Sequence, residues 1–240
     1  MKWPAATGVV FSLLLAAACG GSSTTAPTPM PTPVSTPEPA PTPAAPTARY
    51  QVMFDATWSA ATHPVDFPGS PHFSRLIGGT HAEGVVFWEP GAVASAGIEA
   101  MAETGATSPL DAEIQAAIAV GTAERLIEGG GIRRSPGRVG VEFQIGRDHP
   151  LVTLVSMIAP SPDWFVGVHG LSLVENGDWV AEKTVTLAPY DAGTDGGDTY
   201  RSPNLETMPR EPIRDIVDPP LAPGGVAAPL GTFTFVRLPS

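Results

Sequence analysis

Apolar residues recur at every second position in three parts of the chain, residues 50–58, 139–145 and 232–235. A period of two is typical of a strand with one buried face. Residues 151–159 (LVTLVSMIA) are mostly apolar at both kinds of position, which predicts a central strand buried on both faces. A further strand is predicted at residues 179–187.

Two segments predict helices instead. Ser108-Pro109 is typical of a helix start, with a serine cap and proline at the first helical position. Apolar residues keep helical spacing from Leu110 onwards, and the glycines at 129–131 are expected to end this helix. A shorter helix is predicted at about residues 91–103. Strands joined by Pro- and Gly-rich turns, with these interruptions, favour a β-sandwich with two short helical insertions.

The amino-terminal residues indicate export. An apolar run from Val9 to Ala18 is too short to span a membrane, which takes about 20 apolar residues. The stretch from Leu15 to Cys19 resembles a bacterial lipoprotein signal, in which cleavage precedes the cysteine and lipid is attached to its sulfur. Residues 1–19 are therefore predicted to be a lipoprotein-type signal peptide, with lipid attachment at Cys19. The alternative is an ordinary secretory signal, which would leave the protein secreted.

Composition divides the rest of the chain into a linker and one domain. Residues 20–47 are almost wholly Pro, Thr, Ser, Ala and Gly, which predicts an extended linker without a buried face. Residues 48–240 suffice for one domain core and carry the formal charge of −11. That charge argues against binding nucleic acid or anionic lipid through a basic face. We expect a domain at the cell surface or outer envelope that meets the membrane only through its lipid anchor.

Two of the predicted strands end in acidic turns. One turn holds Asp163, and the other holds Asp191 and Asp195 within PYDAGTDGGDTY. If the two strands run parallel, or if one short strand such as residues 165–168 separates them, the three carboxylates converge at one end of the sandwich. A divalent cation would remove their repulsion, and calcium accepts about six to eight oxygen ligands at irregular angles. The alternative is that these aspartates only cap turns.

Several short motifs occur in order along residues 49–216. They are ATWS (56–59), HP (63–64), DFP (66–68), PHFS (71–74), IGGTH (77–81), SPDW (161–164), DAGTD (191–195) and SPN (202–204). This series resembles the spondin domain, the amino-terminal matrix domain of F-spondin and mindin, here in a bacterial lipoprotein form.

The resemblance implies an antiparallel β-sandwich of the calcium-dependent lipid-binding type, closed by a strand near residues 233–238. It also implies one Ca²⁺ ion at one end of the sandwich, with side-chain ligands Asp163, Asp191 and Asp195, because each of them lies inside a matching motif. Animal members carry cysteines in this domain and thrombospondin repeats after it, and this chain shows neither. The resemblance to the animal proteins therefore does not by itself imply that this chain adheres to integrin or matrix.

Other residues that could support chemistry have simpler interpretations. The histidines lie without the close spacing of a zinc site, and we expect them to hydrogen-bond their own turns; they are His63, His72, His81, His149 and His169. The sequence has no serine nucleophile elbow and no phosphate-binding glycine loop after a strand. These features favour a protein that is not an enzyme.

The expected function is therefore a calcium-binding, surface-displayed domain for adhesion or for recognition of an extracellular protein or glycan. Two alternatives stay open. One is a metal-dependent hydrolase that uses the same ion, with Asp198 or His169 as its base. The other is a purely structural envelope protein, in which calcium matters only for folding.

Overall fold

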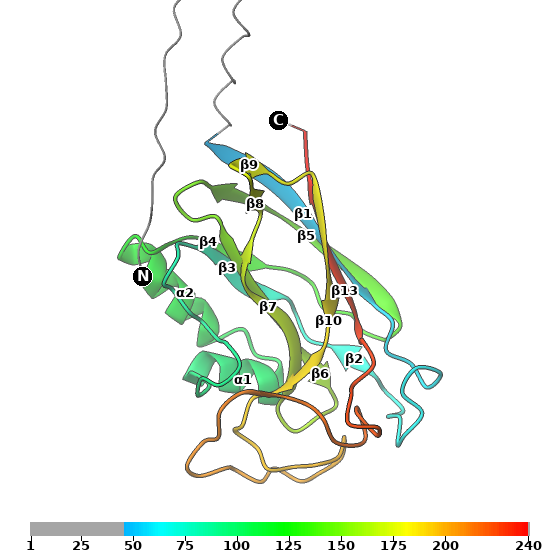
Figure 1. The fold of residues 1–240 in the computed structure, drawn as a ribbon. Coiled ribbons are helices and arrows are strands. Elements are labelled where there is room, and N and C mark those ends of the chain that lie inside the picture. The colour runs from blue at the N-terminus through cyan, green and yellow to red at the C-terminus, as the bar shows by residue number, and fades with distance from the viewer. Residues whose placement is uncertain (1–45, 240) are drawn as a thin grey trace, which may run out of the picture. The chain divides into compact units, whose positions relative to one another are not determined.

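Two antiparallel sheets make up most of the fold (Figure 1). The computed structural model describes residues 46–239, so the predicted signal peptide with Cys19 and most of the linker lie outside the described residues. The strands are β1 Thr47–Ala56, β2 His72–Phe73, β3 Ile77–His81, β4 Ala123–Glu128, β5 Gly137–Gly146, β6 Leu151–Ala159, β7 Trp164–Ser172, β8 Val174–Glu175, β9 Asp178–Trp179, β10 Glu182–Leu187, β11 Pro189–Asp191, β12 Arg214–Asp215 and β13 Gly231–Arg237. The first sheet has the order β10-β13-β1-β5 and the second β12-β11-β7-β6-β3-β4, with β2 paired to β6 and β8-β9 forming a separate hairpin.

The first sheet follows the predicted alternation. In β1, Tyr50, Val52 and Phe54 are fully buried, while the residues between them are half-buried. Phe233 of β13 lies opposite Phe54 in the ladder, and the two rings meet edge to face with centroids 5.1 Å apart. The strands predicted at residues 50–58, 139–145 and 232–235 are thus confirmed, with β1 ending slightly earlier at Ala56.

The second sheet is covered on both faces, as the apolar run of β6 predicts. Val152 and Leu154 belong to the core between the two sheets, whereas Val155 and Met157 belong to a second core. This second core packs against helices α1, Ala96–Thr104, and α2, Leu110–Ala119. The result is an all-β sandwich with two short helical insertions on one outer face, as predicted (Figure 1).

The predicted end of α2 is wrong. The helix ends at Ala119, and residues 123–128 form β4, which pairs with β3. This segment (AERLIE) consists largely of helix-forming residues, so the ladder offered by β3 overrides local propensity. The glycines at 129–131, expected to end the helix, instead follow β4. Gly131 lies close to the backbone of another segment, because a Cβ there would be 2.7 Å from the carbonyl oxygen of Phe73.

The strand predicted at residues 179–187 is divided in two: Trp179 belongs to the β8-β9 hairpin, and β10 joins the first sheet beside β13. The next strand along the chain, β11, joins the second sheet beside β7. The chain therefore crosses from one sheet to the other around Ala188. This crossing brings the acidic loop after β11 to the start of β7.

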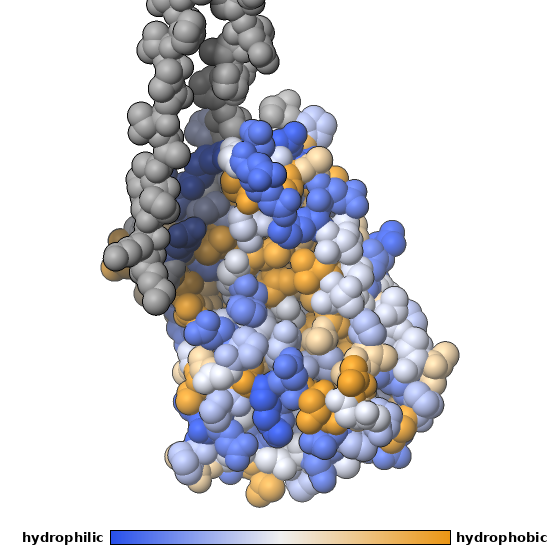
Figure 2. Space-filling model, in the orientation of Figure 1, coloured by the Kyte–Doolittle hydropathy of each residue, from blue (hydrophilic) through white to orange (hydrophobic). Residues whose placement is uncertain are grey.

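Apolar side chains exposed on the surface are few among the described residues. Figure 2 shows an apolar area in the upper half of one face, bordered by hydrophilic residues, and a lower end where both kinds alternate. The exposed large apolar residues are Val86, Val93, Val120, Leu205, Met208, Val217, Val226 and Val236. Neither α1 nor α2 has the length and apolar character needed to cross a membrane.

The start of α1 is held by a side chain of α2. Ser95 caps α1 by accepting a hydrogen bond from the Ile98 amide, at 3.2 Å. Glu113 then accepts hydrogen bonds from the Ser95 hydroxyl and the Gly97 amide, both at 2.7 Å. By contrast, Pro109 rather than Ser108 caps α2, without a side-chain hydrogen bond.

Glu113→Ala is expected to lower the free energy of unfolding by about 1–3 kcal/mol, because it removes both charge-assisted hydrogen bonds at the start of α1. Urea unfolding followed by circular dichroism measures the change. Glu83→Ala, at an exposed acid in a loop, is the matched control and should stay within about 0.5 kcal/mol of wild type. Equal losses for the two variants would contradict the capping role.

Candidate functional site

The turn between β6 and β7 buries the carboxylate of Asp163. The Ser161 hydroxyl accepts a hydrogen bond from the Trp164 amide at 3.1 Å and fixes this turn. Asp163 itself has no exposed surface, and its Oδ2 accepts hydrogen bonds from the amides of Thr194 at 2.8 Å and Asp195 at 3.1 Å. Its Oδ1 is also buried, yet it has no hydrogen-bond partner among the described residues. Half of a buried carboxylate is therefore unsatisfied.

Asp191 is the last residue of β11 and lies opposite Trp164 in the ladder with β7. Its Oδ1 accepts a hydrogen bond from the Gly193 amide, and its Oδ2 accepts one from Arg214 Nη2, each at 2.8 Å. Gly193 has a φ of 73°, and a Cβ there would lie 2.3 Å from the carbonyl oxygen of Glu211. This position therefore requires glycine.

Asp195 holds the following loop in place. Its Oδ1 accepts hydrogen bonds from the amides of Gly197 at 2.8 Å and Leu205 at 3.2 Å. Its backbone forms an isolated antiparallel bridge with Glu206. The segment between residues 196 and 204 is thereby folded back against the site.

Burial and the repulsion between neighbouring acids raise the pKa values of several carboxyl groups near the start of β7. We call this part of the structure, around Asp163, Asp191 and Asp195, the aspartate corner. Burial, followed by the charge of Asp191, raises the pKa of Asp163 to about 6, although the amide hydrogen bonds from Thr194 and Asp195 oppose the shift. Burial also raises the pKa of Asp191, against the opposing effect of Arg214. The pKa of Glu103, near the end of α1, is raised by burial and then by neighbouring acids, Asp195 among them.

The three predicted aspartates lie at one edge of the second sheet because of the strand between them. β7 pairs antiparallel with β6 on one side and with β11 on the other. Asp163, just before β7, and Asp191, at the end of β11, therefore lie at the same edge, and Asp195 follows in the next turn. The arrangement uses the intervening strand, residues 164–172, and not a parallel pairing of the two strands.

A cavity of about 120 Å³ lies at this edge and is lined by Asp191 and Asp195, but not by Asp163. Within residues 46–239, no three His, Cys, Asp or Glu side chains are gathered closely enough to hold a metal ion. Asp191 instead pairs with Arg214, and Asp195 turns one oxygen toward amides of its own loop. The donor set still fits a hard cation, because it consists of carboxylate oxygens and includes one that is buried and unpartnered.

Comparison with known proteins identifies the domain. The sequence profile of the family described as Spondin_N matches residues 48–222 of the chain. The chain belongs to the spondin N-terminal domain family. Spondin-1 of Mus musculus is 36% identical over 188 residues, which cover 74% of this chain and 23% of that protein. Spondin-2 of Rattus norvegicus is 33% identical over 199 residues, which cover 81% of this chain and 59% of that protein.

Spondin-2 of Homo sapiens is similar to a comparable extent, with 32% identity over 195 residues that cover 80% of this chain and 57% of that protein. The chain thus matches less than two thirds of the length of each of these relatives. What is shared is the spondin domain itself.

The histidines of this spondin domain serve local structure. Three bond their own turns through Nδ1, with partners Thr62 Oγ1 for His63, Ser70 O for His72 and Ala82 O for His81. His149 bonds the more distant carbonyl of Gly121, and the ring of His169 packs on Trp88 with centroids 4.8 Å apart. The two bases considered for a hydrolase line different cavities, since Asp198 lies beside Asp191 and His169 lies beside His81.

Sequence reasoning missed the residues that complete the corner. Arg214 lies in the short strand β12, between the buried residues Ile213 and Ile216, and this apolar-polar-polar-apolar pattern is its only signal. Glu103 gives no signal, because the helix end that carries it is placed there only by packing. Thr194 lies inside the acidic motif, but its contribution comes mainly from its backbone amide.

Without metal, wild type should gain stability relative to Asp163→Asn as the pH falls from about 7.5 to 5. The folded pKa of Asp163 is about 6, above the unfolded value of about 3.9, so between these values the folded state binds a proton that the unfolded state has lost. The charged carboxylate therefore costs stability above pH 6, by up to roughly 3 kcal/mol. Urea unfolding of both proteins in chelator at the two pH values measures the difference.

The comparison with Asp163→Asn isolates this effect from the histidines. Burial lowers the pKa values of His63 and His81, so those groups lose stabilisation as the pH falls below about 6.5, in both proteins alike. If the difference in the free energy of unfolding between the two proteins is the same at both pH values, ionisation of Asp163 does not destabilise the folded state, and the prediction is wrong.

Proposed function

We propose that this spondin domain is a non-enzymatic, calcium-binding module, displayed outside the cell for adhesion or for recognition of an extracellular partner. The observation that carries the calcium part is the Asp163 carboxylate. One of its oxygens is buried without a hydrogen-bond partner among residues 46–239, and burial, followed by the charge of Asp191, raises the pKa of the carboxyl group. The three aspartates therefore give this end of the sheet an excess of negative charge that a cation would offset.

The residues that would hold the ion are Asp163, Asp191 and Asp195. Bound Ca²⁺ would supply positive charge and order the end loops. Arg214 already neutralises one oxygen of Asp191, so it acts as an internal counter-ion that competes with the cation. The loop amides of Gly193 and Gly197 orient the aspartates from the other side.

The proposed display outside the cell rests on the amino-terminal sequence. The lipoprotein-type signal would place lipid on Cys19, and residues 20–47 would form the linker to the domain. Extended at ~3.1 Å per residue, this linker would hold the domain several tens of Å from the membrane. The partner would be an extracellular protein or glycan, and the membrane would be met only through the lipid.

Calcium should raise the melting temperature of the full-length protein relative to chelator, corresponding to roughly 0.5–1.5 kcal/mol at calcium near the dissociation constant of a weak extracellular site. Differential scanning calorimetry measures this shift, and isothermal titration should give one ion per chain. Asp191→Asn and Asp195→Asn should each weaken calcium binding about tenfold or more, because each removes a charged oxygen ligand.

Asp178→Asn is the matched control for these variants. Asp178 is an exposed acid in the β8-β9 hairpin, away from the corner, and its replacement should leave calcium affinity unchanged. Identical melting curves of the wild-type protein in calcium and in chelator, together with no heat of calcium binding, would refute the metal site.

A further inference from the structure

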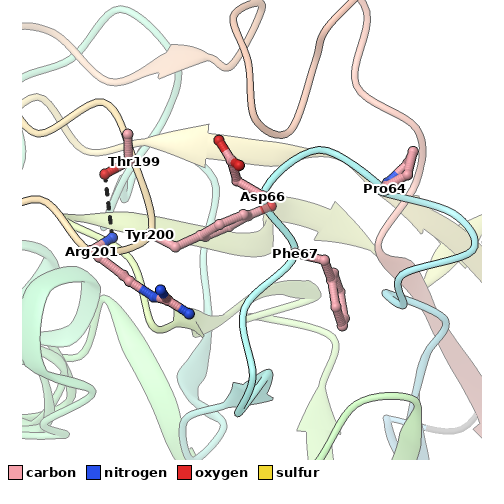
Figure 3. Close-up of a pocket in the computed structure, with 6 residues that line it drawn as sticks. All are labelled: Pro64, Asp66, Phe67, Thr199, Tyr200 and Arg201. Atoms are coloured by element: carbon pink, nitrogen blue, oxygen red, sulfur yellow. Dashed lines mark hydrogen bonds between the residues drawn. The ribbon is translucent and has the colours of Figure 1, made fainter.

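A second cavity, of about 530 Å³, lies on the loop that leaves the candidate calcium site. Two separate segments line it: Pro64, Asp66 and Phe67 from one loop, and Thr199, Tyr200 and Arg201 from the other (Figure 3). Asp163, Asp191 and Asp195 do not line this cavity. Its lining combines aromatic surface with both signs of charge.

The cavity has two charged side chains, and neither is paired with another group among the described residues. The carboxylate of Asp66 and the guanidinium of Arg201 are exposed, and neither makes a hydrogen bond or ion pair with another described residue. Figure 3 shows them on either side of the Tyr200 ring, and they do not pair with each other. Asp66 adopts a left-handed backbone with φ 47°, which is uncommon for a residue other than glycine. Both charges are therefore free to meet a ligand.

The turn that carries Arg201 is well fixed. The Ser202 hydroxyl accepts hydrogen bonds from the amides of Asp198 at 3.2 Å and Thr199 at 3.1 Å. The Thr199 hydroxyl in turn accepts one from the Arg201 amide at 3.4 Å (Figure 3). A rigid turn presents its side chains with little loss of entropy on binding.

Tyr200 lines the cavity but keeps its polar group buried. Tyr200 is only 4% exposed, and its hydroxyl is buried without a hydrogen-bond partner among the described residues. Burial raises the pKa of this hydroxyl, and the charge of Asp66 adds to the rise. The Trp58 indole lies beside the hydroxyl and opposes the shift, but its approach falls short of a hydrogen bond, so the hydroxyl keeps its proton.

We propose that this cavity binds a sugar ring of an extracellular glycan, an inference that rests on the recognition function proposed above and names its ligand class. A sugar carries neighbouring hydroxyls that both donate and accept hydrogen bonds. They would donate to Asp66 and accept from Arg201, while the C–H face of the ring packs on Pro64 and Phe67. An acidic peptide fits less well, because it would meet Asp66 and a chain of formal charge −11.

The cavity shares structural support with the calcium corner. The Tyr200 ring packs edge to face on Trp164 with centroids 5.5 Å apart, and Trp164 directly follows Asp163. Asp195 holds the Gly197 amide at 2.8 Å, shortly before Thr199 in the chain. Calcium that orders Asp163 and Asp195 should therefore tighten sugar binding, and sugar should tighten calcium binding by the same factor.

The test is saturation-transfer NMR on the full-length protein in calcium, with the methyl glycosides of glucose, galactose, mannose and N-acetylglucosamine as probes. At least one glycoside should receive saturation and give a millimolar dissociation constant on titration. Arg201→Ala and Asp66→Asn should each weaken it roughly tenfold, the loss of one charge-assisted hydrogen bond. Asparagine tolerates the left-handed backbone at this position, so the second variant should fold.

Arg133→Ala is the matched control, because Arg133 is also exposed and without an ion pair but does not line the cavity. It should bind the glycoside like wild type, and all variants should melt within a few degrees of it.

No saturation transfer to any of the four glycosides would overturn the proposal, and so would transfer that Arg201→Ala and Asp66→Asn leave unchanged. Binding of a hexaglutamate peptide that depends on Arg201, with no glycoside bound, would replace the sugar by an acidic peptide. The calcium melting shift is recorded on the same samples. A retained shift without sugar binding refutes only the sugar, whereas sugar binding without a shift refutes only the metal.

Discussion

The end of this domain that carries the acidic loops depends on one buried carboxylate. Asp163 has no exposed surface, and its Oδ2 is held by the amides of Thr194 and Asp195 from a loop that is remote in sequence. These hydrogen bonds to a charged acceptor tie the β6-β7 turn to the loop after β11. Burial of a charge with only half of its hydrogen bonds made is unfavourable, and the neighbouring charge of Asp191 adds to that cost.

The two sheets supply the frame for this arrangement. β7 lies between β6 and β11, so the residues at the ends of these strands are brought to one edge by backbone pairing. The chain can reach this edge because it crosses from the first sheet to the second around Ala188. β6 is buried on both faces, between the first sheet and the two helices, so the strand next to β7 is fixed by close packing.

Aromatic packing connects the aspartate corner with the neighbouring cavity. Trp58 contacts Phe67 with ring centroids 5.4 Å apart and Tyr200 with centroids 5.7 Å apart, and Tyr200 contacts Trp164 in turn. This series of rings runs from the wall of the cavity to the residue beside Asp163. Such contiguous packing gives a physical route by which order at one site stabilises the other.

The sequence alone determined the parts of the protein that repeat a simple period or occupy one continuous segment. The alternation in β1 and the apolar run of β6 specify strands and their buried faces, and the DAGTD segment marks Asp191 and Asp195 as an acidic loop. Only the tertiary structure decided that AERLIE becomes β4, that Arg214 neutralises Asp191, and that Asp66 faces the same cavity as Tyr200. The reason is that strand ladders, ion pairs and cavity walls join residues distant along the chain, and their free energy exists only once the sheets have brought those residues together.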